Sequence, residues 1–272
     1  MVHVALGQFG AGEDKEGNLA EAARLVADAA GRGASLVVLP EYAMFAASRM
    51  DERYVASAEA LDGPFVQGLA EVARRHGVHV VAGVNERLDD DPGRMSNTLV
   101  AVGPSGGIVA TYRKLHLYDA FGYKESDVVR AGDLGAPVTF TVGGLTVGMQ
   151  TCYDVRFPEV TRMLVDAGAD LLALPAAWVP GPLKEDHWRT LVRARAIENT
   201  IYVAAAGQSA PIGAGNSMLV DPMGVIVASL GEGTGIASGE AAPGRIAEVR
   251  AKNPALDLRR FSVTPISATP TP

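Results

Sequence analysis

Only one cysteine is present among the 272 residues. A lone cysteine excludes an intrachain disulfide framework and any zinc site built from several thiolates, and it weakly favours a reducing cytosol. The chain also lacks an apolar run long enough for a signal peptide or a membrane span, and its first residues lead directly into the strand-like stretch HVALGQF. We therefore expect a cytoplasmic protein that has no membrane partner.

Basic residues are outnumbered, with 24 Lys and Arg against 31 Asp and Glu, which gives a formal net charge of -7. The basic residues are scattered rather than gathered into a patch, so the sequence shows no electrostatic footprint for nucleic acid or for an anionic membrane. At 48% apolar and 20% charged residues, the chain can build a large buried core. A small molecule is the expected partner.

Strand-like apolar runs alternate with amphipathic segments. A helical pattern over 19–30 leads into the apolar run SLVVLP at 35–40, and the same order recurs from DGPFVQGLAEVARRHG to VHVVAGV and from PEVTRMLVDAGA to DLLALPAAW. A fourth helix is expected over about 184–198. NTLVAVGPSGGIVATY and NSMLVDPMGVIVASL each indicate two strands joined by a turn. The order predicts an α/β fold of mixed sheets with helices outside, and a loose similarity between the halves suggests two stacked sheets.

The C-terminal residues differ in composition from the rest of the chain. From Phe261 the sequence continues as SVTPISATPTP, which has few apolar residues and is rich in Thr and Pro. We interpret 1–260 as one domain and 261–272 as a tail that is disordered unless a partner holds it.

The cysteine itself, Cys152, lies in MQTCYDVRFP, between an apolar run and a proline suited to the first turn of a helix. This pattern places it where a strand ends, and ligands of open α/β sheets collect at such ends. A free cysteine is often only a small buried hydrophobic residue. Here, however, Tyr153, Asp154 and Arg156 follow it, and these polar groups are costly to bury without partners.

Two other strand ends carry chemically useful residues. Glu41 directly follows SLVVLP and precedes aromatic and apolar residues, where desolvation favours the raised pKa of a general base. Lys114 follows the strand-like GIVATY. For each residue alone, a surface charge at a loop is the favoured interpretation. Together with Cys152 they permit a specific chemistry, in which a carboxylate activates the thiol and a cation stabilises the oxyanion formed on a carbonyl or nitrile carbon.

At these residues the sequence resembles the nitrilase superfamily of carbon-nitrogen hydrolases. The superfamily's three catalytic motifs are similar to LPEYAMF, YRKLHLYD and TCYDVRFPE, which occur in the same order, and the resemblance runs from residue 2 to about residue 250. HWRTLVRARAIENTIYVAAAGQ and NSMLVDPMGVIVASLGEG also resemble later segments of the superfamily. The form CYDVRFPE together with HLYD is similar to the amidase branch that includes omega-amidase and deaminated glutathione amidase.

The resemblance implies a four-layer α-β-β-α sandwich that commonly pairs into a homodimer or a larger homo-oligomer. It implies Glu41, Lys114 and Cys152 as the catalytic triad, with no metal and no organic cofactor. Glu125, in DAFGYKESD, matches a second glutamate of related amidases that positions the lysine or the leaving amine, although a solvated loop carboxylate is the alternative. The implied reaction converts an amide to an acid and ammonia through a thioester, with the backbone N–H of Tyr153 assisting Lys114 at the oxyanion.

Several other polar and aromatic residues could contribute. Arg156, four residues after Cys152, could bind a substrate carboxylate through its planar fork, or it could form a salt bridge with Asp154 or Glu159. Trp178 could form a wall of the pocket or pack in the core. The loop in VPGPLKEDHW could cover the site or only connect its flanking elements. His116 and His187 raise the possibility of a Cys–His protease, but neither lies in a recognisable protease motif.

Three functions remain open at this stage. The leading hypothesis is an amidase that acts on a small, carboxylate-bearing amide. The second is a hydrolase of the same chemistry that acts on nitriles or N-carbamoyl groups. The third is a catalytically silent binding or scaffold protein, which the presence of all three triad residues disfavours. The sequence leaves the physiological substrate and the oligomer size undetermined.

Overall fold

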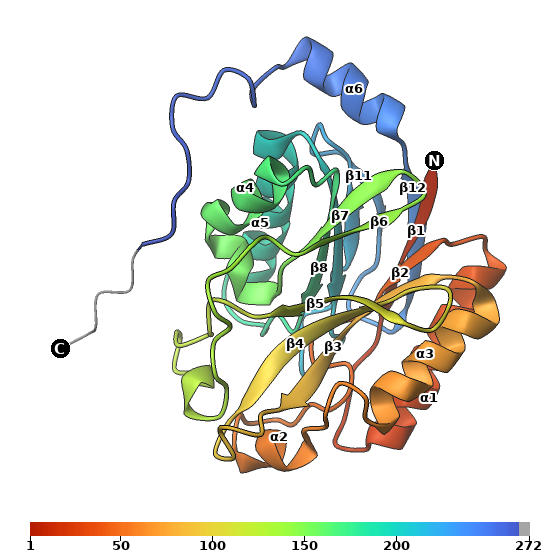
Figure 1. Cartoon of the computed structure of the whole chain (residues 1–272), viewed down its shortest axis with the longest axis vertical. Helices are drawn as coiled ribbons and strands as arrows, with labels where there is room; N and C mark the ends of the chain where they lie inside the picture. Colours follow the sequence, from red (N-terminus) through yellow and green to blue (C-terminus); the bar gives the residue numbers. More distant parts are fainter. Residues whose placement is uncertain (267–272) are drawn as a thin grey trace.

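The computed structural model describes residues 1–266 and consists of two stacked sheets with helices on both outer faces (Figure 1). The first sheet has the order β12-β1-β2-β3-β4-β5, with β12 (Gly235–Ala241), β1 (Val2–Gln8), β2 (Leu36–Val38), β3 (His79–Arg87), β4 (Met95–Val102) and β5 (Ile108–Arg113). The second sheet has the order β11-β10-β9-β8-β7-β6, with β11 (Ile226–Ser229), β10 (Met218–Val220), β9 (Tyr202–Gly207), β8 (Leu171–Ala176), β7 (Leu145–Met149) and β6 (Thr139–Val142). The predicted α-β-β-α sandwich is confirmed.

Both sheets are mixed, and both have the same arrangement. In the first sheet β1, β2 and β3 are parallel neighbours, while β12, β4 and β5 pair antiparallel. In the second sheet β7, β8 and β9 are parallel neighbours, while β6, β10 and β11 pair antiparallel. Parallel neighbours end at a common edge, so loops that follow different strands meet there.

The helices lie outside the two sheets, and most of them pack on an outer face of the sandwich. They are α1 (Lys15–Gly31), α2 (Glu52–Ser57), α3 (Pro64–His76), α4 (Pro158–Asp166), α5 (Lys184–Asn199) and α6 (Pro243–Lys252), with short 3-10 helices η1 (Glu125–Asp127) and η2 (Cys152–Arg156). Figure 1 shows α1 and α3 beside the first sheet and α4 and α5 beside the second. Asp14 caps α1 by accepting a hydrogen bond from the Glu16 N–H at 3.1 Å. The helices expected near 19–30 and 184–198 are confirmed.

Strand residues alternate between the space between the sheets and the space under the helices. In β2, Leu36 and Val38 belong to the core between the sheets, whereas Val37 packs in the core beneath α1 and α3. In β8, Leu171 faces the space between the sheets and Leu172 faces the core beneath α4 and α5. Because both faces of these strands are buried, their sequences are continuous apolar runs rather than polar-apolar alternations.

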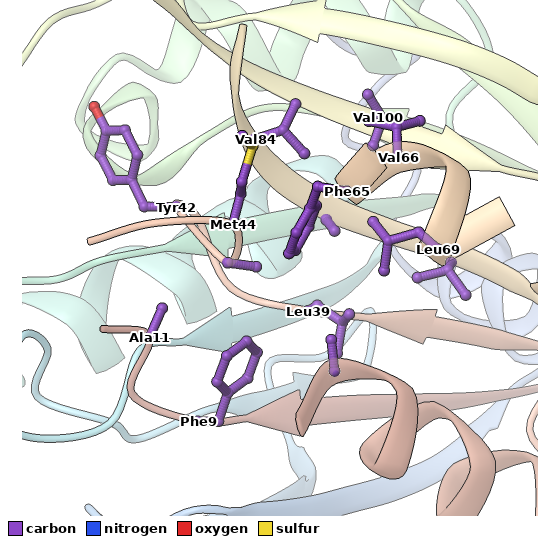
Figure 2. Close-up of a cluster of buried hydrophobic side chains, with 14 of the residues drawn as sticks. Phe9, Ala11, Leu39, Tyr42, Met44, Phe65, Val66, Leu69, Val84 and Val100 are labelled. Carbon is purple, nitrogen blue, oxygen red and sulfur yellow. The ribbon is translucent and has the colours of Figure 1, made fainter. Parts of the chain in front are cut away.

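The core beneath α1 and α3 extends to the loop that follows β2. Figure 2 shows Leu39 and Met44 of this loop together with Phe9 beyond β1 and with Phe65 and Leu69 of α3. All five side chains are buried. Such packing fixes the position of the loop, which lies at the carboxyl end of the central strand β2.

The predicted C-terminal tail is only partly described. Residues 261–266 have no regular secondary structure, and Phe261 and Ile266 are 91% and 88% exposed. Residues 267–272 lie outside the described residues. Within 1–266, no helix combines the length and apolarity needed to cross a bilayer.

Candidate active site

Three strand ends and one short helix bring the predicted catalytic side chains together. Glu41 follows β2, Lys114 directly follows β5, Cys152 follows β7 and begins η2, and Glu125 begins η1. All four line one cavity of about 300 Å³, and all four are buried. The first sheet therefore supplies the carboxylate and the ammonium, and the second sheet supplies the thiol.

The backbone turns sharply at two of these strand ends. Tyr42, next to Glu41, has φ 55°, and Cys152 has φ 42°. A left-handed conformation in a residue other than glycine costs about 1 to 3 kcal/mol and occurs where the surrounding structure enforces it. Both turns therefore indicate positions at which packing holds a side chain in a fixed direction.

A glycine of β3 makes room for the loop that carries Glu41. The N–H of Gly83 donates to the carbonyl oxygen of Pro40 at 3.0 Å. A Cβ at this position would lie 2.5 Å from the backbone nitrogen of Tyr42 and 2.6 Å from the Cα of Glu41. Only a residue without a side chain allows the loop to lie this close to β3.

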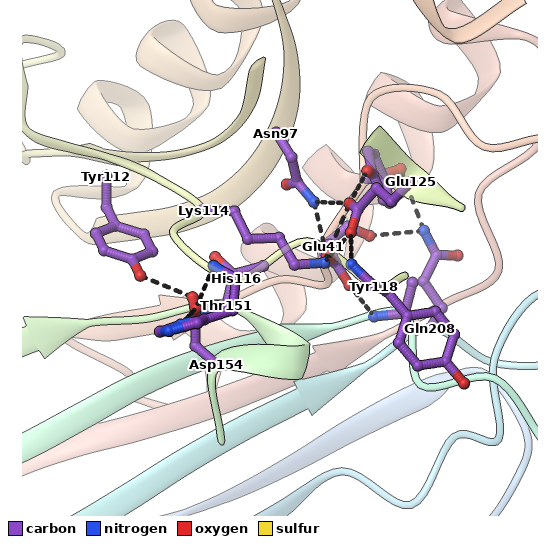
Figure 3. Close-up of polar contacts among 12 residues, drawn as sticks. Glu41, Asn97, Tyr112, Lys114, His116, Tyr118, Glu125, Thr151, Asp154 and Gln208 are labelled. Carbon is purple, nitrogen blue, oxygen red and sulfur yellow. Dashed lines mark hydrogen bonds and ion pairs between the residues drawn. The ribbon is translucent and has the colours of Figure 1, made fainter. Parts of the chain in front are cut away.

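Lys114 forms ion pairs with both glutamates, as Figure 3 shows. Its Nζ lies 2.9 Å from Oε1 of Glu41 and 2.9 Å from Oε2 of Glu125. The Lys114 side chain is 2% exposed. Since neither carboxylate nor ammonium reaches bulk water, each depends on the others for its compensating charge.

Glu41 has further donors on both of its oxygens. Asn97 of β4 donates to Oε1 at 2.7 Å, and the backbone N–H of Ala177 donates to Oε2 at 2.6 Å. Ala177 follows β8, so one donor comes from each sheet. These contacts fix the orientation of the carboxylate.

Glu125 is held in the same way. It accepts hydrogen bonds from the Tyr42 hydroxyl at 2.6 Å, from the Tyr118 backbone N–H at 2.6 Å and from Asn97 at 3.0 Å. Asn97 thus links the two glutamates through one amide group (Figure 3). The alternative that Glu125 is a solvated loop carboxylate is wrong, because the residue is 2% exposed.

A glutamine after β9 connects the Glu41 loop to the second sheet. Gln208 Nε2 donates to the carbonyl oxygens of Glu41 at 2.8 Å and Tyr42 at 3.1 Å. Its Oε1 accepts from the backbone N–H of Ala11 at 2.7 Å. Gln208 is fully buried. A single side chain therefore ties the loops that follow β1 and β2 to the opposite sheet.

The electrostatic environment favours charged Lys114 and Glu125. Burial opposes the ammonium form, but the carboxylates of Glu125 and Glu41 outweigh it and hold the pKa of Lys114 well above its ordinary value. Burial by itself raises the pKa of Glu125, but the charge of Lys114 and the hydrogen bond from Tyr42 hold that pKa below its ordinary value. The cavity therefore contains a positively charged Lys114 beside a negatively charged Glu125.

The environment of Cys152, in contrast, favours the neutral form of its side chain. Burial raises the pKa of the Cys152 thiol well above its ordinary value, and the Glu41 carboxylate adds to the rise, whereas Lys114 opposes it. The thiol is consequently protonated at neutral pH. A reaction that uses its sulfur as a nucleophile needs a base at the moment of attack.

Aromatic side chains form much of the remaining wall. Tyr118, Tyr153 and Trp178 line the cavity. Tyr118 and Tyr153 pack edge to face with ring centroids 5.1 Å apart, and the Trp178 ring lies 5.2 Å from that of Trp188. Trp178 thus contributes both to the cavity wall and to the core, the two alternatives that the sequence left open.

Arg156 is not on the cavity wall. Its guanidinium carbon lies 5.0 Å from the centroid of the Trp178 ring, and one of its NH2 groups lies 3.4 Å from Nδ1 of His187. Among residues 1–266 it forms no ion pair, so the alternative of a salt bridge with Asp154 or Glu159 is wrong. Binding of a substrate carboxylate by Arg156 stays a prediction.

The carboxylate of Asp154 is fully occupied elsewhere. It accepts from the Tyr112 hydroxyl at 2.7 Å and from the His116 backbone N–H at 2.9 Å, and Nδ1 of His116 lies 2.9 Å from the same carboxylate. Neither His116 nor His187 lines the cavity, so the structure does not support a Cys–His pair. Within the described part of the chain, no group of three or more His, Cys, Asp or Glu side chains is arranged to hold a metal ion.

A carbon-nitrogen hydrolase family model matches residues 3–251. The chain belongs to this family. The hydrolase is 42% identical to the deaminated glutathione amidase of Escherichia coli O157:H7 over 259 residues, which cover 95% of this chain and 97% of the relative. The family and the amidase names of its relatives establish an amidase, a hydrolase of carbon-nitrogen bonds.

Solved structures agree with this assignment. A member of branch 10 of the nitrilase superfamily from Saccharomyces cerevisiae has a TM-score of 0.84 and 30% identity, with 96% of this chain and 97% of that chain covered. A glutamate-to-glutamine mutant of an amidase from Nesterenkonia sp. AN1, in which acrylamide has added to the active-site cysteine, has a TM-score of 0.79 and 25% identity, with 95% of this chain and 100% of that chain covered. The predicted family, fold and type of reaction are confirmed.

Two residues of the hydrolase's cavity region were missed in the sequence. Asn97 lies within β4, where the sequence indicates only a buried strand. Lys184 lines the cavity at the start of α5 and is 6% exposed. The loop before it, including Val179 and Pro180, also lines the cavity, whereas the expectation that VPGPLKEDHW covers the site stays a prediction. Lys184 itself lies within this stretch, which was the available signal for it.

Proposed function

We propose that the hydrolase converts small carboxylate-bearing amides to the acid and ammonia, with Cys152 as nucleophile and Glu41 as general base. The observation that carries this proposal is that a protonated thiol and a buried carboxylate, held by hydrogen bonds from Asn97 and Ala177, line the same cavity. A thiol whose pKa is raised is a poor nucleophile until a neighbouring base removes its proton.

The first half-reaction forms a thioester. Glu41 takes the proton of Cys152 as the sulfur bonds to the amide carbon, and the carbonyl electron pair moves onto the oxygen. When this tetrahedral intermediate collapses, the carbon-nitrogen bond breaks, and Glu41 returns the proton to the departing nitrogen. Ammonia leaves, and the acyl group remains on sulfur.

The second half-reaction uses Glu41 again. It removes a proton from a water molecule, whose oxygen attacks the thioester carbon. Collapse of the second tetrahedral intermediate breaks the carbon-sulfur bond and releases the carboxylic acid. The sulfur recovers its proton from Glu41, which restores the resting state.

Lys114 and the backbone N–H of Tyr153 stabilise the oxyanion of both intermediates. An oxyanion donor of this kind contributes about 3 to 4 kcal/mol to the transition state. Glu125 acts by holding Lys114, to which it is paired at 2.9 Å. Trp178 limits the size of the substrate from the cavity wall.

The carboxylate on the substrate is supported by the relatives. Several are named deaminated glutathione amidase, and deaminated glutathione is a small amide that carries carboxylates. A cavity of about 300 Å³ is at the lower end of the range for small-molecule sites. Nitriles and N-carbamoyl compounds are the competing substrates, because the same nucleophile and oxyanion donors would serve them.

Ammonia release from a matched panel tests the proposal. Glutaramate, hexanamide, glutaronitrile and N-carbamoyl-β-alanine are compared at equal concentration, and glutaramate should be turned over fastest. Cys152→Ala should retain the wild-type melting temperature and release no ammonia. Hydroxylamine added during turnover of glutaramate should divert acyl-enzyme to a hydroxamate. Full activity of Cys152→Ala, or a faster reaction with the nitrile or the carbamoyl compound, would remove the proposal.

We also propose that residues 1–260 form the catalytic domain, that the hydrolase works in the cytoplasm and that it forms a homodimer or a larger homo-oligomer. Truncation after residue 260 should leave turnover of glutaramate unchanged. Size-exclusion chromatography with light scattering gives the mass of the assembly, which is compared with 28.3 kDa for one chain. Fractionation of the source cells gives the location.

A further inference from the structure

Lys184 has an unusual environment for a lysine. It is 6% exposed and lines the same cavity as Cys152 and Lys114. Its Nζ donates to the Tyr118 hydroxyl at 2.8 Å. The same Nζ lies 4.7 Å from the ring centroids of Phe121 and Trp178 and 4.8 Å from that of Tyr118. We call these three rings with the lysine the aromatic corner.

The cavity's two lysines differ in their compensating charge. Lys114 is paired with two carboxylates, whereas Lys184 forms no ion pair with any residue in 1–266. The pKa of Lys184 is lowered, first by burial and then by the positive charge of Arg156. A buried ammonium without a carboxylate is costly unless a bound group supplies the negative charge.

The aromatic corner satisfies only part of this need. Ring faces attract a cation, but they offer no acceptor in line with its N–H groups. An ammonium has three donors, and the Tyr118 hydroxyl takes one of them. The catalytic steps described above use Lys114 and leave Lys184 without a role.

We propose that Lys184 is the specificity-determining residue of the hydrolase and binds the substrate's carboxylate in the aromatic corner while Cys152 attacks the amide carbon. The inference rests on the proposed function, because it names the group that would recognise the substrate's charge. Lys184 is better placed for this than Arg156, because it lines the cavity and Arg156 does not.

The test compares glutaramate with glutaramide, which have the same length and shape but differ in the charge of one end. Initial rates of ammonia release give kcat/KM for each. Wild type should prefer glutaramate by roughly 10-fold or more. Lys184→Met, which keeps most of the side chain and removes the charge, should lower kcat/KM for glutaramate by roughly 10- to 100-fold, mainly through KM, and change that for glutaramide by less than about threefold.

Two further variants separate recognition from structure. Tyr118→Phe removes the hydrogen bond to Lys184 but leaves its charge, so it should keep the preference for glutaramate. Lys184→Arg keeps a cation and should retain more of that preference than Lys184→Met. Glutarate carries carboxylates but no amide, so its binding can be measured without its being hydrolysed. With glutaramide as the substrate, the inhibition constant of glutarate should rise at least 10-fold in Lys184→Met.

The possible failures are distinct. If wild type hydrolyses both amides without preferring glutaramate, Lys184 does not select for charge. This result overturns the inference even if none of the variants folds. Equal losses on both amides in a folded Lys184→Met would also overturn the inference and leave the proposed function intact. If wild type hydrolyses neither amide, the proposed function fails and the inference fails with it.

Discussion

Lys114 and Glu41 form a 2.9 Å ion pair between side chains that are 2% and 1% exposed. Glu125 contacts the same ammonium from another element, so the three side chains form one buried ion-pair cluster. In such an arrangement the two carboxylates share one compensating charge. Removing that charge and removing one carboxylate are therefore different perturbations.

Lys114→Met and Glu41→Gln should affect stability and activity to different extents. Lys114→Met leaves two facing carboxylates without a buried cation and should lower the free energy of unfolding by about 3 to 5 kcal/mol. Glu41→Gln leaves the pair of Lys114 and Glu125 and should lower it less, but turnover should be lost because an amide cannot carry the proton. Urea denaturation and ammonia release measure both quantities. Equal stability of the two variants would contradict this account of the buried ion-pair cluster.

The raised pKa of Cys152 should appear in the pH dependence of stability. Unfolded chains release the thiol proton near pH 9, whereas the folded protein keeps it to higher pH. The stability that the neutral thiol contributes is present below the unfolded pKa and is lost as pH rises through the folded pKa. The free energy of unfolding should therefore fall more steeply above about pH 9 in wild type than in Cys152→Ala. Parallel curves would show that the thiol is not perturbed.

Gly83→Ala should act on catalysis through the loop that carries Glu41. Its Cβ would lie 2.6 Å from the Cα of Glu41, so the loop must move. We expect a loss of about 1 to 3 kcal/mol in stability and a fall in kcat larger than any change in KM. Gly31→Ala is the matched control, because a Cβ there meets no atom within 4 Å. A wild-type kcat in Gly83→Ala would exclude this positioning role.

Arg156→Lys tests the carboxylate-binding role that the sequence suggested. Since the guanidinium lies over Trp178 at 5.0 Å and does not line the cavity, we expect similar, small losses in kcat/KM for glutaramate and glutaramide. The melting temperature should fall, because the cation's contact with Trp178 is weakened. A loss confined to glutaramate would restore Arg156 as the residue that binds the carboxylate.

The sequence predicts the positions of Glu41, Lys114 and Cys152 well for a simple reason. Each follows a short strand-like run, which is buried in β2 and β7 and largely exposed in the edge strand β5. Strand ends are where this type of sheet collects polar groups. The sandwich follows from the order of helices and strands together with the resemblance to a family. These features depend on local periodicity, which a single sequence displays.

The missed features depend on distances that local patterns do not contain. Asn97 is polar within a fully buried strand, and only the three-dimensional structure shows that it links two glutamates. Arg156 was placed near Cys152 by a spacing of four residues. That segment is the 3-10 helix η2, in which four residues correspond to a rotation of about 120°, against about 40° in an α-helix. The spacing therefore does not bring the two side chains to the same face.

Because of Gln208, the position of the catalytic base depends on a part of the chain that is synthesised late. It holds the loop of Glu41 from a position beyond β9, and the donor Ala177 likewise comes from the second half of the chain. A growing chain that ends after β5 and Lys114 has the base and the lysine but no thiol. Once Cys152 has been made, the sulfur meets its base only when the second sheet docks on the first. Newly made protein therefore gains hydrolytic activity with the closing of the sandwich, so turnover is a sensitive reporter of that late step in folding.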